Sequence, residues 1–201
     1  MSRRYQLKAR AETQAETRQR IVDAAIHLHE TVGPARTTIT AIADRAGVGR
    51  LSVYRHFPQD ADLLAACSSA YWERNPAPDP QPWRQITDPV ERLRVALTES
   101  YAYHRRTAAM IARVLADVGD QPHMIPYHQH WQHAAQIVAA GWKPDGRTRH
   151  RLQAAAGHAL SFTTWQSLSQ QHGLSDRAAI AVMTCMVTCA ATGPQAAGPA
   201  H

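Results

Sequence analysis

The sequence has few cysteines and no long apolar run. Its three cysteines, Cys67, Cys185 and Cys189, are too few and too far apart for a disulfide scaffold. No apolar stretch approaches the roughly 20 residues that a membrane-spanning helix needs, and the basic, polar N-terminus lacks the apolar core of a signal peptide. We therefore expect neither a membrane anchor nor an export signal, and a reduced cytoplasm is the expected location.

Signatures of catalysis are missing as well. The sequence has no nucleophile elbow and no glycine-rich phosphate-binding loop. It also has no pair of carboxylates in an apolar setting, because Glu99, Asp117 and Asp120 are isolated from one another. We therefore expect a protein that is not an enzyme and that uses no cofactor.

The twelve histidines raise the question of a metal site, because four of them crowd one segment. These four are His123, His128, His130 and His133. Their spacing fits no tight zinc pattern, no cysteine lies nearby, and Pro126 interrupts the segment. We expect polar pocket lining or a solvated helix surface here rather than a metal. A His-dependent metal or redox sensor stays open as an alternative.

Length and charge indicate more than a small binding module. With 201 residues and 44% hydrophobic content, the chain can bury a core and exceeds the size of a lone DNA-binding module of about 50–60 residues. A second functional region is therefore expected. The net charge of +6 suits a polyanionic partner, and arginine carries most of the basic excess, which favours bidentate contacts to phosphate or guanine.

A compact helical pattern occupies residues 37–57. Apolar residues recur at i, i+3, i+4 and i+7 from Ile39, and the hydroxyl of Thr38 can cap this helix. Gly47 ends it, because glycine adopts the left-handed conformation without a steric cost. A second short helix follows from about Arg50. The pattern predicts a helix-turn-helix whose second helix can enter a phosphate-lined groove.

The residues that carry this pattern are Gly33, Thr37, Thr38, Ile42, Ala43, Ala46, Gly47, Val48, Val53, Tyr54, Phe57 and Leu63. With them, the chain resembles the tetracycline-repressor (TetR) family of transcriptional regulators. The resemblance implies an all-α fold, with an N-terminal three-helix helix-turn-helix domain and a helical bundle that binds a ligand and dimerises. It also implies that Tyr54 and His56 bind backbone phosphates.

The DNA-binding residues that we predict are Thr37, Thr38, Arg50, Leu51, Ser52, Tyr54, Arg55 and His56. Arg50 is expected to influence base preference, whereas Tyr54 and His56 should hold phosphates of any sequence. The resemblance implies repression as the default action: a homodimer occupies a palindromic operator on double-stranded DNA and is released by a small-molecule effector. A DNA-binding regulator without an effector stays open as an alternative.

Composition divides the chain into three parts. Residues 1–16 are polar and basic and predict a flexible arm, and residues 17–58 hold the helix-turn-helix domain. Residues 59–201 are expected to form a connecting helix and the ligand-binding and dimerisation domain. Inside this part, residues 75–82 carry proline at every second position, which predicts a linker. Beyond it, helices are predicted over 89–105, 107–118, 125–140, 147–171 and 175–190.

Two sets of residues suggest functions for the second region. Aromatic and polar side chains on separate helices could line a small-molecule cavity: Tyr101, His104, Met110, Arg113, Trp131, Phe162, Trp165 and Gln166. The last predicted helix is apolar on more than one face, which favours a partner subunit, and Met183 is expected to lie in that seam. Cys185 and Cys189 on this helix are expected to pack rather than form a disulfide.

Overall fold

The computed structural model of the protein describes residues 3–118 and 124–192, and these residues form helices and no strands. The predicted all-α fold is confirmed. The chain divides into two compact units, one made of Met1–Pro76 with Ala108–His123 and the other of Ala77–Thr107 with Met124–His201. Among the described helices, none is long and apolar enough to cross a bilayer.

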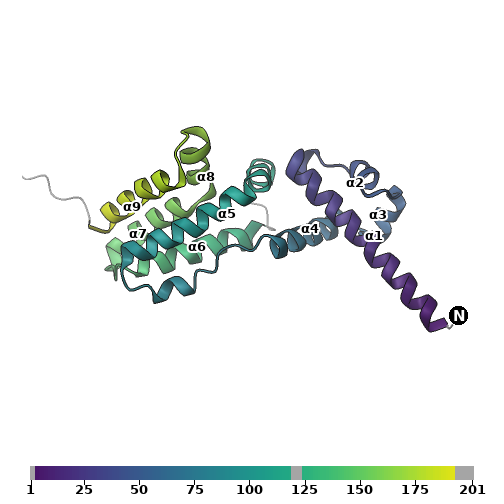
Figure 1. The fold of residues 1–201 in the computed structure, drawn as a ribbon, viewed down its shortest axis with the longest axis horizontal. Helices are drawn as coiled ribbons and strands as arrows, with labels where there is room; N and C mark the ends of the chain where they lie inside the picture. The colour runs from purple at the N-terminus through teal and green to yellow at the C-terminus, as the bar shows by residue number, and fades with distance from the viewer. Residues whose placement is uncertain (1–2, 119–123, 193–201) are drawn as a thin grey trace, which may run out of the picture. The chain divides into compact units, whose positions relative to one another are not determined.

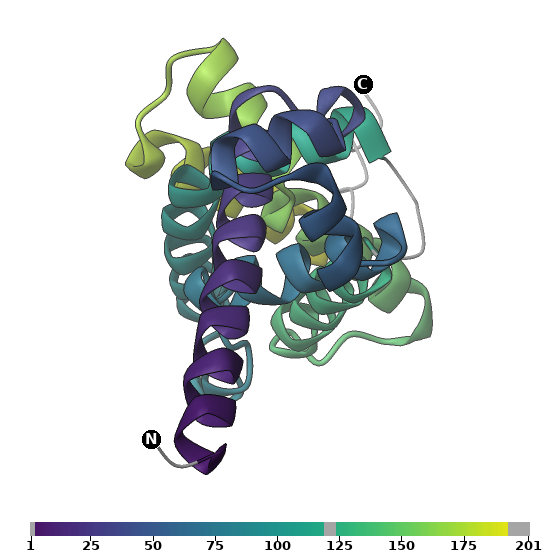
Figure 2. The same ribbon diagram turned by 90° about the vertical axis from the view of Figure 1, so that its right-hand side faces the viewer.

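The first unit is built on a long helix that supports three shorter ones. Its elements are α1 (Arg3–Thr31), the 3-10 turn η1 (Pro34–Arg36), α2 (Ile39–Ala46), α3 (Arg50–His56) and α4 (Asp60–Arg74). α2 and α4 pack against α1, and α3 follows α2 through a tight turn (Figures 1 and 2). Ile21 and Ala25 of α1, Ile42 of α2 and Val53 of α3 meet in one buried core. This arrangement is a helix-turn-helix.

The predicted boundaries of α2 are confirmed. The Thr38 hydroxyl accepts a hydrogen bond from the Ala41 N–H at 3.2 Å, which satisfies one of the free donors at the helix start. Gly47 ends the helix at φ +66°, and its N–H donates to the carbonyl oxygen of Ala43. A side chain at this φ would cost backbone strain, so the turn into α3 depends on glycine.

The structure corrects the prediction of a separate flexible arm over residues 1–16. Residues from Arg3 onward belong to α1, which runs unbroken to Thr31. The segment contains helix-favouring Ala and Glu residues, and Lys8 and Glu12 form an i, i+4 ion pair at 3.9 Å. The helical extension is exposed from Lys8 to Glu16, so its polar composition reflects a solvated helix surface.

The second unit is a helical bundle that follows a proline-rich segment of the chain. Residues 75–81 form no helix, as predicted. The bundle contains η2 (Pro82–Gln85), the part of α5 (Pro89–Val118) up to Thr107, α6 (Ile125–Ala140), α7 (Gly146–Leu160), α8 (Phe162–Trp165), the π-helical η4 (Gln166–Gln171) and α9 (Asp176–Thr192). α7 packs between α6 and α9 (Figure 1).

Two helix boundaries differ from those predicted. Residues 89–118 form one 30-residue helix rather than two, because no glycine or proline interrupts them and the Thr107 hydroxyl is satisfied by the Tyr103 carbonyl at 2.9 Å. The predicted helix over 147–171 breaks at Ser161, which has extended backbone angles. The Ser161 hydroxyl accepts from the Thr164 N–H at 3.2 Å and so caps a new helix.

Candidate nucleic-acid interface and aromatic cluster

α3 is a short helix with one buried side and one exposed side. Val53 is fully buried, whereas Leu51 is 81% exposed and Tyr54 is 42% exposed. Arg50 and Arg55 are also exposed. An arginine can bind the O6 and N7 atoms of guanine with two hydrogen bonds, and an apolar side chain can contact the methyl group of thymine. The exposed side therefore has the chemistry needed to read a major groove.

Of the other predicted DNA-binding residues, two are half-buried and two are hydrogen-bonded within the domain. Ser52 and His56 are half-buried at the edges of α3. The Thr37 hydroxyl donates to the Gly33 carbonyl oxygen at 2.8 Å, and the Thr38 hydroxyl caps α2. These two threonines fix the start of α2, and each hydroxyl oxygen keeps further hydrogen-bonding capacity.

A cation that the sequence did not indicate lies against the end of α3. The guanidinium carbon of Arg18 lies 4.7 Å from the ring centroid of Phe57, the buried residue that follows α3. A cation over an aromatic face is attracted to the ring's negative electrostatic potential. Arg18 therefore connects α1 to the end of α3, and only the tertiary structure reveals this pairing.

Two side chains at the end of α5 form hydrogen bonds with the segment that precedes α2. The Arg113 guanidinium donates from Nε to the Glu30 carbonyl oxygen at 2.8 Å, and the Asp117 carboxylate accepts from the Ala35 N–H at 3.0 Å. Gly33 has φ +92°, and a Cβ at this position would overlap the Asp117 carboxylate. The close approach requires glycine for both reasons. Asp117, which was expected to be isolated, has a structural partner.

The structure corrects two members of the predicted ligand-binding set. Met110 is buried in the core of the first unit, and Arg113 donates a hydrogen bond to the backbone of α1. Both follow Thr107, the point at which α5 leaves the second unit. Both lie on a helix that was predicted to belong to the bundle, but the periodicity of a helix does not show which core the helix faces.

Five of the predicted ligand-binding residues come together in the second unit. His104 of α5 is at the centre, and its ring centroid lies 4.8 Å from Trp131, 5.7 Å from Phe162, 6.1 Å from Trp165 and 6.3 Å from Tyr101. We call these five residues the aromatic cluster. The eighth predicted residue, Gln166, is half-buried at the start of η4, directly after Trp165.

Burial determines the protonation state of His104. The side chain is fully buried, and this desolvation lowers its pKa to about 4, although a backbone hydrogen bond to Leu160 opposes the shift. The ring is therefore neutral near pH 7. Because the Leu160 carbonyl can only accept, Nε2 donates to it at 2.9 Å, and this assignment leaves Nδ1 as an acceptor.

Two buried polar atoms of α5 have no hydrogen-bond partner among the described residues. They are Nδ1 of His104 and Oγ of Ser100, which lie one helical turn apart on α5. An unpaired buried polar atom costs about 1–3 kcal/mol, so such atoms mark places where a further donor or acceptor would be favourable. A mostly apolar molecule with one hydrogen-bonding group fits this chemistry.

Metal-binding chemistry is not assembled among the described residues. No group of three or more His, Cys, Asp or Glu side chains comes together there, and His123 lies outside those residues. His133 Nε2 lies 2.9 Å from Gln81 Nε2.

Cys67 is buried, and burial raises the pKa of its thiol to about 12, so it behaves as a small apolar residue.

The outer face of α9 carries exposed apolar side chains. Val182 and Met186 are 42% and 46% exposed and stand one turn apart, whereas Met183 and Val187 are buried within the unit. The prediction that Met183 lies in an intersubunit seam is therefore wrong. Cys185 and Cys189 are exposed rather than packed, and both line a groove of about 970 Å³ between α5 and α9.

Comparisons with known proteins agree with the geometry of the first unit. The family model described as bacterial regulatory proteins, tetR family, matches residues 21–67. The HTH-type transcriptional regulator AcrR of Shigella flexneri is 41% identical over 66 residues, which are 33% of this chain and 28% of that protein. The HTH-type transcriptional regulator SrpR of Pseudomonas putida is 45% identical over 51 residues, 25% of this chain and 24% of that one.

A third relative matches over a longer stretch. The HTH-type transcriptional repressor KstR of Rhodococcus jostii is 31% identical over 86 residues, which are 43% of this chain and 40% of that protein. The chain thus matches between 24% and 40% of the length of these relatives. The helix-turn-helix geometry, the matched residues and the relatives agree, and residues 21–67 of this chain match the helix-turn-helix of the tetR family of bacterial regulatory proteins.

Proposed function

We propose that the protein is a DNA-binding transcriptional regulator that acts as a homodimer. The observation that carries the proposal is the exposed face of α3, where Arg50, Leu51, Tyr54 and Arg55 project from a helix whose other side is fixed in a core. In the proposed complex, Arg50 contacts base edges and Tyr54 and His56 contact phosphates. A regulator of this kind acts in the cytoplasm, on the chromosome.

A homodimer accounts for the form of the expected operator. Two copies related by a twofold axis present two recognition helices to successive major grooves about 34 Å apart, so the site is an inverted repeat. The exposed Val182 and Met186 on α9 supply an apolar face for such an association. α7, which packs against α9, is the second helix that we place at the interface.

The aromatic cluster supports an effector-responsive form of this function. A mostly apolar molecule would pack against Trp131, Phe162 and Trp165 and hydrogen-bond with His104 or Ser100. α5 carries His104 and, about two and a half turns further on, Arg113, which together with Asp117 one turn later holds the segment before α2. We propose that the effector releases the repressor through α5 and the connecting helix α4.

Selection from a random duplex library tests the DNA-binding part of the proposal. The expected product is an inverted repeat, bound by the dimer with an affinity that falls steeply as salt increases. A thermal-shift screen of metabolites then identifies ligands, and each is added to a titration of the selected duplex. Typical couplings of about 1–3 kcal/mol would change the affinity for DNA by roughly 5- to 150-fold.

The same titration separates the two forms of the regulator. If a ligand stabilises the protein and leaves the affinity for DNA unchanged, the effector-independent regulator is the correct description. The exposed face of α3 supports DNA binding in both cases. A His-dependent metal sensor has no matching observation, because the described residues bring no set of metal-binding side chains together.

A further inference from the structure

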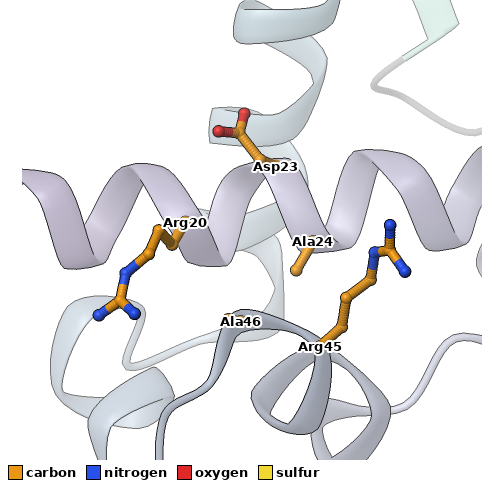
Figure 3. Close-up of a pocket in the computed structure, with 5 residues that line it drawn as sticks. All are labelled: Arg20, Asp23, Ala24, Arg45 and Ala46. Carbon is orange, nitrogen blue, oxygen red and sulfur yellow. The ribbon is translucent and has the colours of Figure 1, made fainter.

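The first unit contains a shallow basic hollow that lies outside the predicted DNA-binding set. It has a volume of about 380 Å³ and is lined by Arg20, Asp23 and Ala24 of α1 and by Arg45 and Ala46 of α2 (Figure 3). Ala24 and Ala46 are buried and small, so they leave room between the two longer side chains. Figure 3 shows the guanidinium groups of Arg20 and Arg45 on opposite sides of these alanines.

The hollow has an uncompensated positive charge. The Asp23 carboxylate accepts hydrogen bonds from Arg74 Nη2 at 2.6 Å and from Gln19 Nε2 at 3.0 Å. In Figure 3 it points away from Arg20 and Arg45. Over the described residues, neither Arg20 nor Arg45 has a carboxylate within salt-bridge distance, and the one side-chain hydrogen bond from Arg20 goes to the neutral hydroxyl of Thr17 at 3.4 Å. Both guanidinium groups are therefore available to donate hydrogen bonds to an anion.

The hollow lies next to the turn that leads into the recognition helix. Arg20 Nη1 is 3.8 Å from the position that a Cβ on Gly47 would occupy, and Gly47 precedes Arg50 by three residues. An anion held by Arg20 would thus lie close to the start of α3. When α3 enters a major groove, the polyanion nearest to this turn is the DNA backbone that borders the groove.

We propose that Arg20 and Arg45 together bind a backbone phosphate of the operator, beyond the contacts made by α3 itself. The proposal rests on DNA binding by this domain and adds a site to it. A phosphodiester is the appropriate ligand, because it is a monoanion with two free oxygens and guanidinium groups can donate to both. Phosphate contacts carry no base preference, so the pair should add affinity and orientation and should not change the selected sequence.

Salt titrations of DNA binding test the site. The variants are Arg20→Gln, Arg45→Gln and the double variant, and the control is Arg84→Gln, which removes an exposed arginine from η2 in the second unit. Binding of each protein to the selected duplex and to a scrambled duplex is measured by fluorescence anisotropy at several salt concentrations. Because Arg20 and Arg45 are exposed, the variants should keep the circular dichroism and melting temperature of the parent protein.

The slope of log K against log salt is negative, and the loss of one phosphate contact should reduce its magnitude by about 0.9. The double variant should show this loss, with an equal drop in affinity for both duplexes, whereas Arg84→Gln should match the parent protein. A double variant with an unchanged salt slope would overturn the phosphate site and leave DNA binding by α3 intact. If the parent protein bound neither duplex, the proposed function itself would fail.

Discussion

His104 combines full burial with a free ring nitrogen, and its surroundings determine how it titrates. Its neighbours in the aromatic cluster are rings, and among the described residues its imidazole hydrogen-bonds to the Leu160 carbonyl. None of these groups stabilises a positive charge as well as water does, so the folded protein holds the neutral ring down to about pH 4. In the unfolded chain the same ring has a pKa of about 6.5 and is protonated below that pH.

This difference makes stability depend on pH. Between about pH 6.5 and pH 4 the unfolded chain binds more protons than the folded one, so the free energy of unfolding falls as the pH falls. The contribution of His104 to the free energy of unfolding should decrease by ~2 kcal/mol from pH 7.5 to pH 5, at 1.36 kcal/mol per pKa unit. Urea unfolding of the parent protein and of His104→Leu at both pH values measures it.

The variant should lose less stability than the parent protein between these two pH values. The control is His172→Leu, which removes an exposed histidine and should leave the parent's pH dependence unchanged. Equal pH dependence in the parent and in His104→Leu would mean that the buried ring is not held neutral.

At this scale the sequence could predict which residues face outward from a short helix. Tyr54 and Arg55 follow Val53 by one and two residues, so a helical rotation of about 100° per residue turns them away from the buried Val53, and both are exposed in the structure. The sequence could not predict that Arg113 bonds to the Glu30 carbonyl, because that pair is 83 residues apart. Such contacts depend on how helices cross, and the period of one helix carries no information about its partner.

At the scale of single elements, Gly33 is the most demanding position of the first unit. Its φ of +92° lies where L side chains are rarely found, and the Asp117 carboxylate occupies the space that a Cβ would need. Gly33→Ala should therefore destabilise the protein by about 1–3 kcal/mol. The measurement is the free energy of unfolding in urea.

A second glycine offers the matched control. Gly157 lies inside α7, and the nearest atom to an added Cβ is the Ala135 Cβ at 3.7 Å, which is an ordinary van der Waals contact. Gly157→Ala should stabilise the protein by about 0.5–1 kcal/mol, because alanine loses less backbone entropy in a helix. Loss of stability at Gly157 equal to that at Gly33 would show that backbone conformation and the Asp117 contact are not the cause.

Element boundaries were predictable where a residue enforces them. Thr38 and Gly47 set the ends of α2, and the prolines of residues 75–81 excluded a helix there. The break at Ser161 was not predictable, because serine is tolerated within helices and only its capping bond to Thr164 ends α7. The helical start of α1 was missed for a similar reason: a solvated helix and a flexible arm share the same polar composition.

At the scale of the whole molecule, association through α9 is the first prediction. Met186→Glu would place a charge in an apolar interface, where an unpaired charge costs about 3 kcal/mol or more. The dissociation constant of the dimer should increase by at least about 100-fold. Sedimentation velocity over a range of protein concentrations measures this change.

The matched control for this experiment adds the same charge elsewhere. Gln132→Glu introduces an isosteric carboxylate at an exposed position on α6, and it should sediment as the parent protein does. A monomeric parent protein would contradict association through α9, and so would a Met186→Glu variant that keeps the parent's dissociation constant.

Direct measurement of DNA recognition by α3 tests the central claim. Fluorescence anisotropy with the selected inverted repeat and a scrambled duplex should show that Arg50→Ala reduces the preference between them by about 1–3 kcal/mol. Tyr54→Ala should weaken binding to both duplexes alike. The account is contradicted if the parent protein binds neither duplex at low salt, or if Arg50→Ala leaves both the affinity and the preference unchanged.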